Sequence, residues 1–159
     1  MNKVYLLIGG NIGSREATLA KARRLIGETC GELISSSSLY ETAAWGKTDQ
    51  PSFLNQALEI NTALNPLQLL QQILKIEKQA GRIRNEKYGP RSIDIDILFF
   101  NDEIHHYPSL KVPHPAIQDR RFVLVPMKEI APKFVHPVHK KTIEELLEGC
   151  ADHLPVRQI

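Results

Sequence analysis

Short apolar runs alternate with amphipathic stretches along the chain, which predicts strands alternating with helices. Residues 4–8 form a fully apolar run that ends at two glycines, a pattern typical of a buried strand. Leu19, Ala22, Leu25 and Ile26 then recur at intervals of three or four, which predicts a helix with one apolar face. The glycines are interpreted as the turn between that strand and that helix. Residues 33–41 predict a second, partly exposed strand.

The second part of the chain repeats this order. Residues 53–60 predict a strand, and Asn65 with the proline after it supplies a cap and a first turn for a helix. The predicted inner side of that helix consists of Leu67, Leu70, Ile73, Leu74 and Glu77. Beyond it, the pattern predicts a short strand at 110–112, a short helix that begins at Pro126 and a last helix capped by Thr142.

The strand predicted over residues 93–99 has two unlike faces. Ile93, Ile95, Ile97 and Phe99 alternate with Asp94, Asp96 and Leu98, so one face is apolar and the other opens with two acids. With the earlier elements, the order is β-α-β-β-α-β plus additions. The predicted fold class is therefore α+β and ferredoxin-like: a mainly antiparallel sheet with helices packed on one face and additional C-terminal elements.

Composition restricts the class of protein without naming a function. A chain of 159 residues is long enough for a core, and we expect a single domain over residues 1–159. The formal net charge of +2 is too small to indicate nucleic-acid binding. The first apolar run is too short for a signal peptide or a membrane span, and Cys30 and Cys150 lack a metal-like spacing. We expect a cytoplasmic monomer with reduced thiols and without a membrane or nucleic-acid partner.

The two acids of the 93–99 strand are the strongest indication of chemistry. Asp94 and Asp96 share one strand face with Cα atoms roughly 7 Å apart, so their charges repel unless a cation lies between them. Hard oxygen ligands suit Mg²⁺, which also binds substrate phosphates. The alternative is an edge strand whose acids only face water, and the two acids by themselves leave that alternative open.

Basic residues around the acids favour a polyphosphate ligand. Arg82, Arg84 and Arg91 precede the strand, and His114 and Arg120 follow it. Guanidinium groups bind phosphate through paired hydrogen bonds, while Mg²⁺ bridges phosphate oxygens. A basic run is otherwise a solvated surface, and that interpretation stays open for this segment.

A third group of residues predicts a site for a flat heterocycle. Thr42, Phe53, Asn55 and Phe122 combine two rings with polar side chains, so the rings would stack on a heterocycle while the amide reads its polar edge. Simpler roles are a core position for Phe122 and a turn for Asn55. Two other classes of protein share some of these features. An RNA-binding module is one, but the middle strands lack the interleaved basic and aromatic residues of such modules. A metal-dependent nuclease is the other, but it would leave Phe53, Asn55 and Phe122 without a role.

Several motifs occur in an order that resembles one known family. The motifs are Gly9-x-Asn11, Tyr40-x-Thr42, Asp49-Gln50-Pro51-x-Phe53-x-Asn55, Glu77-x-x-x-Gly81-Arg82, Lys87-x-Gly89-Pro90-Arg91-x-x-Asp94-Ile95-Asp96-Ile97-Leu98, Val112-Pro113-His114 and Arg120-x-Phe122. They resemble the signature of 6-hydroxymethyl-7,8-dihydropterin pyrophosphokinase, a folate-pathway enzyme, over nearly the whole chain. Leu74 and Pro115 depart from well-known members, which have a polar residue and a tyrosine at these positions.

The resemblance implies an enzyme that transfers a pyrophosphoryl group from ATP to the hydroxymethyl oxygen of the pterin and releases AMP. It implies two Mg²⁺ ions bound by Asp94 and Asp96, with Arg82 and Arg91 as further catalytic residues. The residues implied to bind ATP are Arg82, Arg84, Arg91, Ile97, Lys111, His114 and Arg120. The residues implied to bind the pterin are Thr42, Ala43, Trp45, Phe53, Asn55, Asp94 and Phe122.

Overall fold

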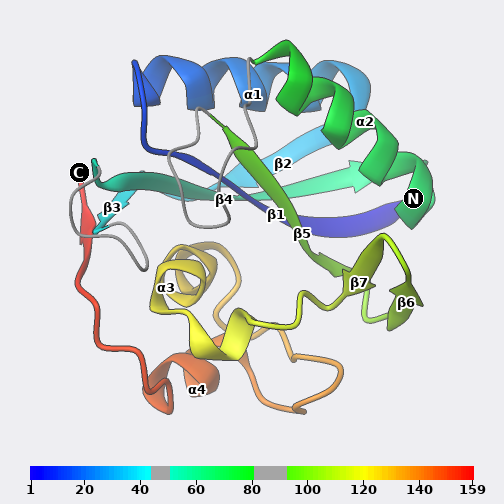
Figure 1. Ribbon diagram of the computed structural model, residues 1–159. Coiled ribbons are helices and arrows are strands. Elements are labelled where there is room, and N and C mark those ends of the chain that lie inside the picture. Colours follow the sequence, from blue (N-terminus) through cyan, green and yellow to red (C-terminus); the bar gives the residue numbers. More distant parts are fainter. Residues whose placement is uncertain (44–50, 81–92) are drawn as a thin grey trace.

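The computed structural model describes residues 1–43, 51–80 and 93–159, and its centre is an antiparallel sheet (Figure 1). The sheet has six strands in the order β5-β1-β4-β3-β8, and β2 also pairs with β4. These strands are β1 (Asn2–Gly10), β2 (Glu32–Ser36), β3 (Tyr40–Thr42), β4 (Phe53–Thr62), β5 (Asp94–Phe100) and β8 (Val156–Gln158). A separate hairpin pairs β6 (His105–Tyr107) with β7 (Leu110–Val112). The helices are α1 (Arg15–Thr29), α2 (Pro66–Gln79), the 3-10 helix η1 (Ile117–Asp119), α3 (Arg121–Ile130) and α4 (Ile143–Glu148).

The strand order confirms the predicted ferredoxin-like plan. Helix α1 connects β1 to β2 across β4, and α2 connects β4 to β5 across β1, so each helix spans one intervening strand. Strand β1 continues through Gly9 and Gly10, which were assigned to a turn by the sequence pattern. The turn lies at residues 11–14, where Gly13 has φ of 69°. None of the helices in the described ranges is long and apolar enough to cross a membrane.

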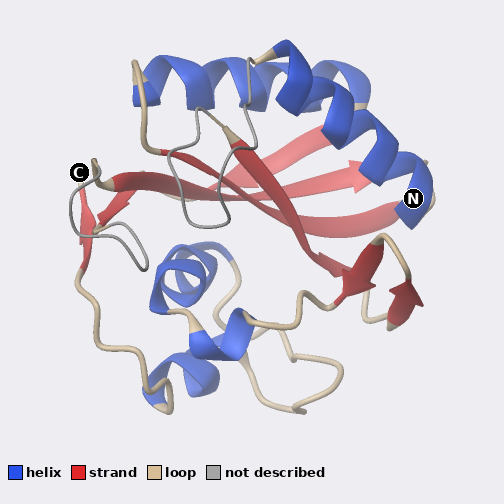
Figure 2. Ribbon diagram, in the orientation of Figure 1, coloured by secondary structure: helices blue, strands red, loops and turns tan. Residues whose placement is uncertain are grey.

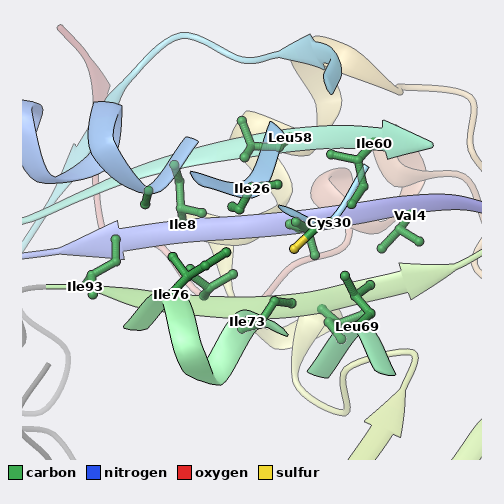
Figure 3. Close-up of a cluster of buried hydrophobic side chains, with 14 of the residues drawn as sticks. Val4, Ile8, Ile26, Cys30, Leu58, Ile60, Leu69, Ile73, Ile76 and Ile93 are labelled. Carbon is green, nitrogen blue, oxygen red and sulfur yellow. The ribbon is translucent and has the colours of Figure 1, made fainter. Parts of the chain in front are cut away.

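Helices cover both faces of the sheet (Figure 2). Helices α1 and α2 lie on one face, where Ile26 and Ile73 pack with Ile8 in a buried cluster (Figure 3). Helices α3 and α4 lie on the other face, where Leu124 of α3 packs in a second cluster that includes Leu7 of β1. The sequence pattern predicted helices on one face only and assigned no position to the additional C-terminal elements. These elements cover the second face because β1, β4 and β5 present apolar residues there as well as polar ones.

The structure corrects the limits of two predicted elements. The strand predicted over residues 33–41 is divided into β2 and β3, because the Ser37 hydroxyl accepts the hydrogen bond from the backbone N–H of Ala57 in place of a strand carbonyl. The helix predicted to begin at Pro126 begins at Arg121, and Pro126 lies inside it. Both differences come from contacts with distant residues, which a local pattern does not contain.

Helix α2 buries a side that agrees only in part with the predicted one. Its start is as expected, with Asn65 and Gln68 forming a reciprocal capping box. Leu67 and Leu74 are exposed. The buried residues are Pro66, Leu69, Ile73, Ile76 and Glu77. The buried side keeps Ile73 and Glu77 of the predicted one and replaces the exposed Leu67 and Leu74 with Leu69 and Ile76.

Strand β5 departs from simple alternation at one point. A register shift opposite Tyr5 and Leu6 of β1 marks a β-bulge. Beyond it, Phe99 belongs to the cluster under α3 instead of the predicted face shared with Ile95. The bulge follows the two acids, so Asp94 and Asp96 still share one face of the strand as predicted.

His136 gives the cluster under α3 a measurable dependence on pH. The residue is 2% exposed, its ring meets Phe99 edge-on, and its Nδ1 accepts hydrogen bonds from the backbone N–H groups of Val138 and His139. Burial, and then the nearby His139, lower the pKa of His136 from 6.5 to about 4. A second proton on this ring is therefore bound more tightly by the unfolded chain than by the folded protein.

The free energy of unfolding is expected to fall as the pH drops from 6.5 toward 4. His136 accounts for at most about 3 kcal/mol of this loss. Urea unfolding across this range measures the loss. His136→Gln should flatten this part of the profile, and the exposed His106→Gln should keep the slope of the parent protein. A profile that is equally steep in His136→Gln would assign the acid sensitivity to other groups.

Candidate active site

A cavity of about 510 Å³ opens at the outer edge of β5, between α2 and the β6–β7 hairpin. Such a volume lies within the range of roughly 300–1,000 Å³ that is usual for small-molecule sites. Five residues predicted from the sequence line it: Asp94, Asp96, Ile97, Lys111 and His114. The structure thus brings the predicted metal ligands together with three of the predicted ATP contacts.

Asp94 and Asp96 are positioned by the pairing of β5 with β1. Asp94 pairs with Gly9 and Asp96 with Leu7, whereas Ile95 between them is buried in the core. Both acids are half-buried and line the cavity, so their carboxylates can meet a ligand there. Two hard oxygen donors on one strand face fit Mg²⁺, which commonly takes one or two carboxylates and completes its shell with water and phosphate. Within the described residues no group of three or more His, Cys, Asp and Glu is arranged to hold a metal.

The sheet register connects this cavity with the predicted heterocycle site. Gly9 pairs with Asp94 on one side and with Asn55 on the other, so these positions share a face of the sheet. Two strand spacings, or roughly 10 Å, separate Asp94 from Asn55. A Cβ atom on Gly9 would overlap the side-chain oxygen of Asn55, so glycine is what leaves room for this amide. Asp94 therefore lies between the cavity and Asn55.

Thr42, the other polar residue of the predicted heterocycle site, lies at the end of β3, beside the start of β4. Thr42 pairs with Phe53, and Tyr40 with Asn55, so these residues lie on the same face as Asp94. Thr42 is 4% exposed, and its hydroxyl has no hydrogen-bond partner in the described part of the chain. A buried hydroxyl without a partner is costly. The polar edge of a ligand would satisfy it.

Two arginines, one from α1 and one from β8, hold β3 in place. Arg15 of α1 donates hydrogen bonds to Glu41 of β3 at 2.8 Å and to the carbonyl oxygen of Ser52 at 3.0 Å. Arg157 of β8 donates to the second carboxylate oxygen of Glu41. Arg15 and then Arg157 hold the pKa of Glu41 below its ordinary value. The segments that carry Thr42 and Phe53 are thereby tied to α1 and to the C-terminal strand.

Phe122 and Arg120 lie at the start of α3. Phe122 is half-buried against the cluster under α3, so the simpler role as a core residue is partly correct. The guanidinium carbon of Arg120 lies 5.6 Å from the centre of the Phe122 ring, a distance suited to a cation–π contact. The ring keeps an exposed part at which a ligand could stack.

His114 is a neutral hydrogen-bond donor at the cavity. Its backbone N–H donates to the carbonyl of Leu98 at 3.0 Å, which ties this segment to the end of β5. Its Nδ1 accepts a hydrogen bond from the backbone N–H of Ala116 at 3.2 Å, so the neutral ring carries its proton on Nε2. Burial and then the charge of Arg120 lower the pKa of His114, and Asp94 opposes this change.

Comparison with known proteins identifies the family. The family model of 7,8-dihydro-6-hydroxymethylpterin-pyrophosphokinase (HPPK) matches residues 5–132. The chain belongs to this family. The 2-amino-4-hydroxy-6-hydroxymethyldihydropteridine pyrophosphokinase of Aquifex aeolicus is 43% identical over 145 residues, which cover 91% of this chain and 90% of that one. The protein of the same name from Bacillus subtilis is 45% identical over 130 residues, which cover 81% and 78%. HPPK membership confirms the predicted family, and with it an ATP-dependent pyrophosphokinase of folate biosynthesis.

Solved structures agree with the HPPK fold. An HPPK-DHPS protein in complex with substrates superimposes with a TM-score of 0.74 at 18% identity, covering 93% of this chain and 43% of that one. Wild-type HPPK-DHPS of Plasmodium falciparum gives a TM-score of 0.75 at 21% identity, covering 94% and 43%. This chain therefore spans less than half the length of these structures, and the likeness concerns the fold.

Some of the site residues implied by the sequence lie outside the part of the chain that the structure describes. Trp45, Arg82, Arg84 and Arg91 lie outside the described residues, and Ala43 is exposed at the end of the first described range. Leu74 and Pro115, the two departures from well-known members, both line the cavity. Their apolar side chains therefore form part of the cavity wall.

Two further residues of this HPPK contribute to the site in ways that sequence analysis did not foresee. Gly9 was assigned to a turn, yet it makes room for Asn55 inside the sheet. Glu77 was placed on the inner side of α2 without a role, yet it lines the cavity and bonds to β5. A carboxylate on the buried side of a helix was the available signal for Glu77. The role of Gly9 follows from its pairing with Asn55, and the local sequence around Gly9 does not show that pairing.

Proposed function

We propose that this chain transfers the pyrophosphoryl group of ATP to the hydroxymethyl oxygen of 6-hydroxymethyl-7,8-dihydropterin and releases AMP. The observation that carries the proposal is the position of Asp94. It lines the cavity at the edge of β5 and also shares a face with Asn55 across Gly9. One carboxylate thus borders both the site assigned to ATP and the site assigned to the pterin.

The cavity is the ATP site in this proposal. Ile97 and Lys111 line it from β5 and β7 and would offer backbone groups to the adenine. The Nε2–H of His114 would donate to a phosphate oxygen, and Arg120 adds positive charge close to His114. These groups act on different parts of one nucleotide.

Asp94 and Asp96 would hold the two Mg²⁺ ions. Bound Mg²⁺ supplies positive charge that neutralises the phosphate oxygens and lowers the pKa of the attacking hydroxyl. The chain contributes the fixed spacing of two carboxylates on a paired strand, which orients the phosphates toward the pterin side of the sheet.

The pterin site is assigned to the Asn55 side of the same face. Thr42 and Asn55 would hydrogen-bond the polar edge of the pterin, which would give the Thr42 hydroxyl a partner. Phe53 and the exposed part of Phe122 would stack on its rings. Ala43 and Trp45 complete the proposed set on the strength of the family resemblance.

Catalytic arginines complete the proposal. Arg82 and Arg91 are assigned to stabilise charge on the bridging and leaving oxygens, with Arg84 as a further phosphate ligand. Arg91 is supported by the family motif that also contains Asp94 and Asp96, and Arg82 by the motif that begins at Glu77. Arg84 is supported by the family resemblance. In the same proposal the protein is a single domain over residues 1–159 that acts as a cytoplasmic monomer, without nucleic-acid or membrane partners.

The proposed reaction predicts a particular pair of products. The purified protein is mixed with ATP, Mg²⁺ and 6-hydroxymethyl-7,8-dihydropterin, and the products are separated by mass spectrometry. We expect AMP and the pterin diphosphate in equal amounts, because the attack is on the β-phosphorus, and neither product without the pterin. ADP with a pterin monophosphate would exclude pyrophosphoryl transfer.

A further inference from the structure

Glu77 is a buried carboxylate that the proposed reaction does not use. It lies in the last turn of α2, is 4% exposed and lines the same cavity as the two acids of β5. Its Oε2 accepts a hydrogen bond from the backbone N–H of Ile95 at 2.8 Å. Since Ile95 separates Asp94 from Asp96, this bond meets the strand between the two proposed metal ligands.

The position of β5 explains why such a bond is needed. β5 is an edge strand that pairs only with β1 in the described sheet. Buried backbone groups on the outer side of an edge strand need an acceptor or donor other than a neighbouring strand. Further along β5, the backbone N–H of His114 serves the carbonyl of Leu98. At Ile95 the carboxylate of Glu77 takes the place of the neighbouring strand.

A third carboxylate at this cavity has two chemically reasonable roles, as a metal ligand or as a support for the strand. In the described part of the chain no group of three or more His, Cys, Asp and Glu is arranged to hold a metal. One oxygen of Glu77 is already bonded to the backbone of β5, and a charged acceptor makes that bond strong. These facts favour the supporting role.

We propose that Glu77 is a positioning residue that fixes the backbone at Ile95 and thereby sets the spacing at which Asp94 and Asp96 meet a divalent cation. The inference rests on the proposed metal role of these two acids. Residues that orient metal ligands through a second hydrogen bond typically affect metal affinity or activity by about 10- to 100-fold. An effect of this size is measurable without relying on turnover.

Two substitutions separate the hydrogen bond of Glu77 from its charge. Glu77→Gln keeps the length of the side chain and one oxygen acceptor but removes the charge. Glu77→Asp keeps the charge but shortens the side chain by one carbon–carbon bond, about 1.5 Å. The shorter carboxylate reaches the N–H of Ile95 only if α2 or β5 moves, so it should disturb the two acids more than Glu77→Gln does.

The measurement is Mn²⁺ binding, followed by electron paramagnetic resonance on protein saturated with a non-hydrolysable ATP analogue. We expect Glu77→Asp to weaken Mn²⁺ binding by about tenfold or more, and Glu77→Gln to retain most of the affinity. Hydrogen exchange at the Ile95 amide should accelerate in Glu77→Asp and stay slow in Glu77→Gln. The single-turnover rate should follow the same order.

Thr62→Val is the matched control. It removes two other hydrogen bonds of a buried side chain: the Thr62 hydroxyl donates to the carbonyl of Cys30 at 2.6 Å and accepts from the backbone N–H of Leu64 at 3.1 Å. Thr62 pairs with Asn2 at the opposite end of the β1–β4 pair from Gly9. It should lower stability without changing Mn²⁺ affinity, and an equal loss of affinity in this control would overturn the proposal.

The remaining outcomes separate the positioning role from the metal site. Unchanged Mn²⁺ binding in Asp94→Asn and Asp96→Asn would refute the proposed metal site itself. If those two variants lose binding while Glu77→Asp binds like the parent protein, only the positioning role of Glu77 is refuted. A loss in Glu77→Gln with normal binding in Glu77→Asp would assign the effect to charge and refute the positioning role. Equal losses in both Glu77 variants would also refute it, because a full-length oxygen acceptor would then not preserve Mn²⁺ binding. Should Glu77→Asp not fold, Glu77→Gln decides alone, since weak Mn²⁺ binding by this variant would refute the positioning role.

Discussion

Asp94→Asn and Asp96→Asn are each expected to lower the turnover number by about 10³-fold or more while the fold is retained. Each substitution keeps the size of the side chain but removes a negative charge that Mg²⁺ requires. The charge neutralisation that a metal supplies is worth several kcal/mol, and each 1.4 kcal/mol corresponds to about a tenfold change in rate. Rapid-quench measurement of AMP formation at saturating Mg²⁺ and ATP gives this loss directly.

The stability of these variants serves as an internal check. Both acids are half-buried, and asparagine keeps the size and shape of the side chain, so the packing around β5 is retained. The midpoint of thermal unfolding should therefore stay close to that of the parent protein. Asp102→Asn is the matched control, because this exposed acid lies in the turn after β5 and away from the cavity lining. Turnover near the parent rate in both active-site variants would eliminate Asp94 and Asp96 as metal ligands.

Local patterns predicted the elements that local physical chemistry determines. The alternation at residues 93–99 gave β5 and placed Asp94 and Asp96 on one face, since side chains alternate along any strand. The start of α2 was equally predictable, because the Asn65 and Gln68 capping box involves residues three apart. The same holds for the cap of α4 by Thr142 and Glu145.

Features that depend on distant parts of the chain were not predictable in this way. Apolar residues lie on several sides of α2, and only packing against the sheet selects Leu69 and Ile76 over the exposed Leu67 and Leu74. The bulge that moves Phe99 to the other face depends on the register between β5 and β1. The covering of the second face by α3 and α4 likewise depends on contacts with β4 and β1.

The site shows the same division. The motifs supplied Asp94, Asp96 and His114 as candidates, and the structure places all three around one cavity. The motifs did not contain the relations among the residues. Two strand pairings place Gly9 between Asp94 and Asn55. The packing of α2 against the edge of β5 brings Glu77 to the backbone of Ile95.

Gly9→Ala is expected to weaken pterin binding by roughly 10- to 100-fold, with little change in ATP affinity. The added Cβ would lie well under 3.0 Å from the side-chain oxygen of Asn55, and the next nearest atoms also belong to Asn55 and to the carbonyl of Leu54. The backbone of β1 and β4 is held by strand pairing and cannot move apart easily, so the Asn55 side-chain amide must turn away from the added methyl group. A polar group of the pterin then loses its partner, at a cost of about 1–3 kcal/mol.

A double-variant cycle distinguishes this cause from a general loss of structure. Asn55→Ala removes the amide that Gly9→Ala displaces, so the double variant should be no worse for pterin binding than either single variant. Gly27→Ala is the control, because a Cβ at this helical position meets nothing within 4 Å and alanine suits a helix. Calorimetric titration with the pterin, in the presence of an ATP analogue, gives the four affinities. If the two losses added instead, Gly9 would act through something other than Asn55, and the shared face would not be the link between the two substrate sites.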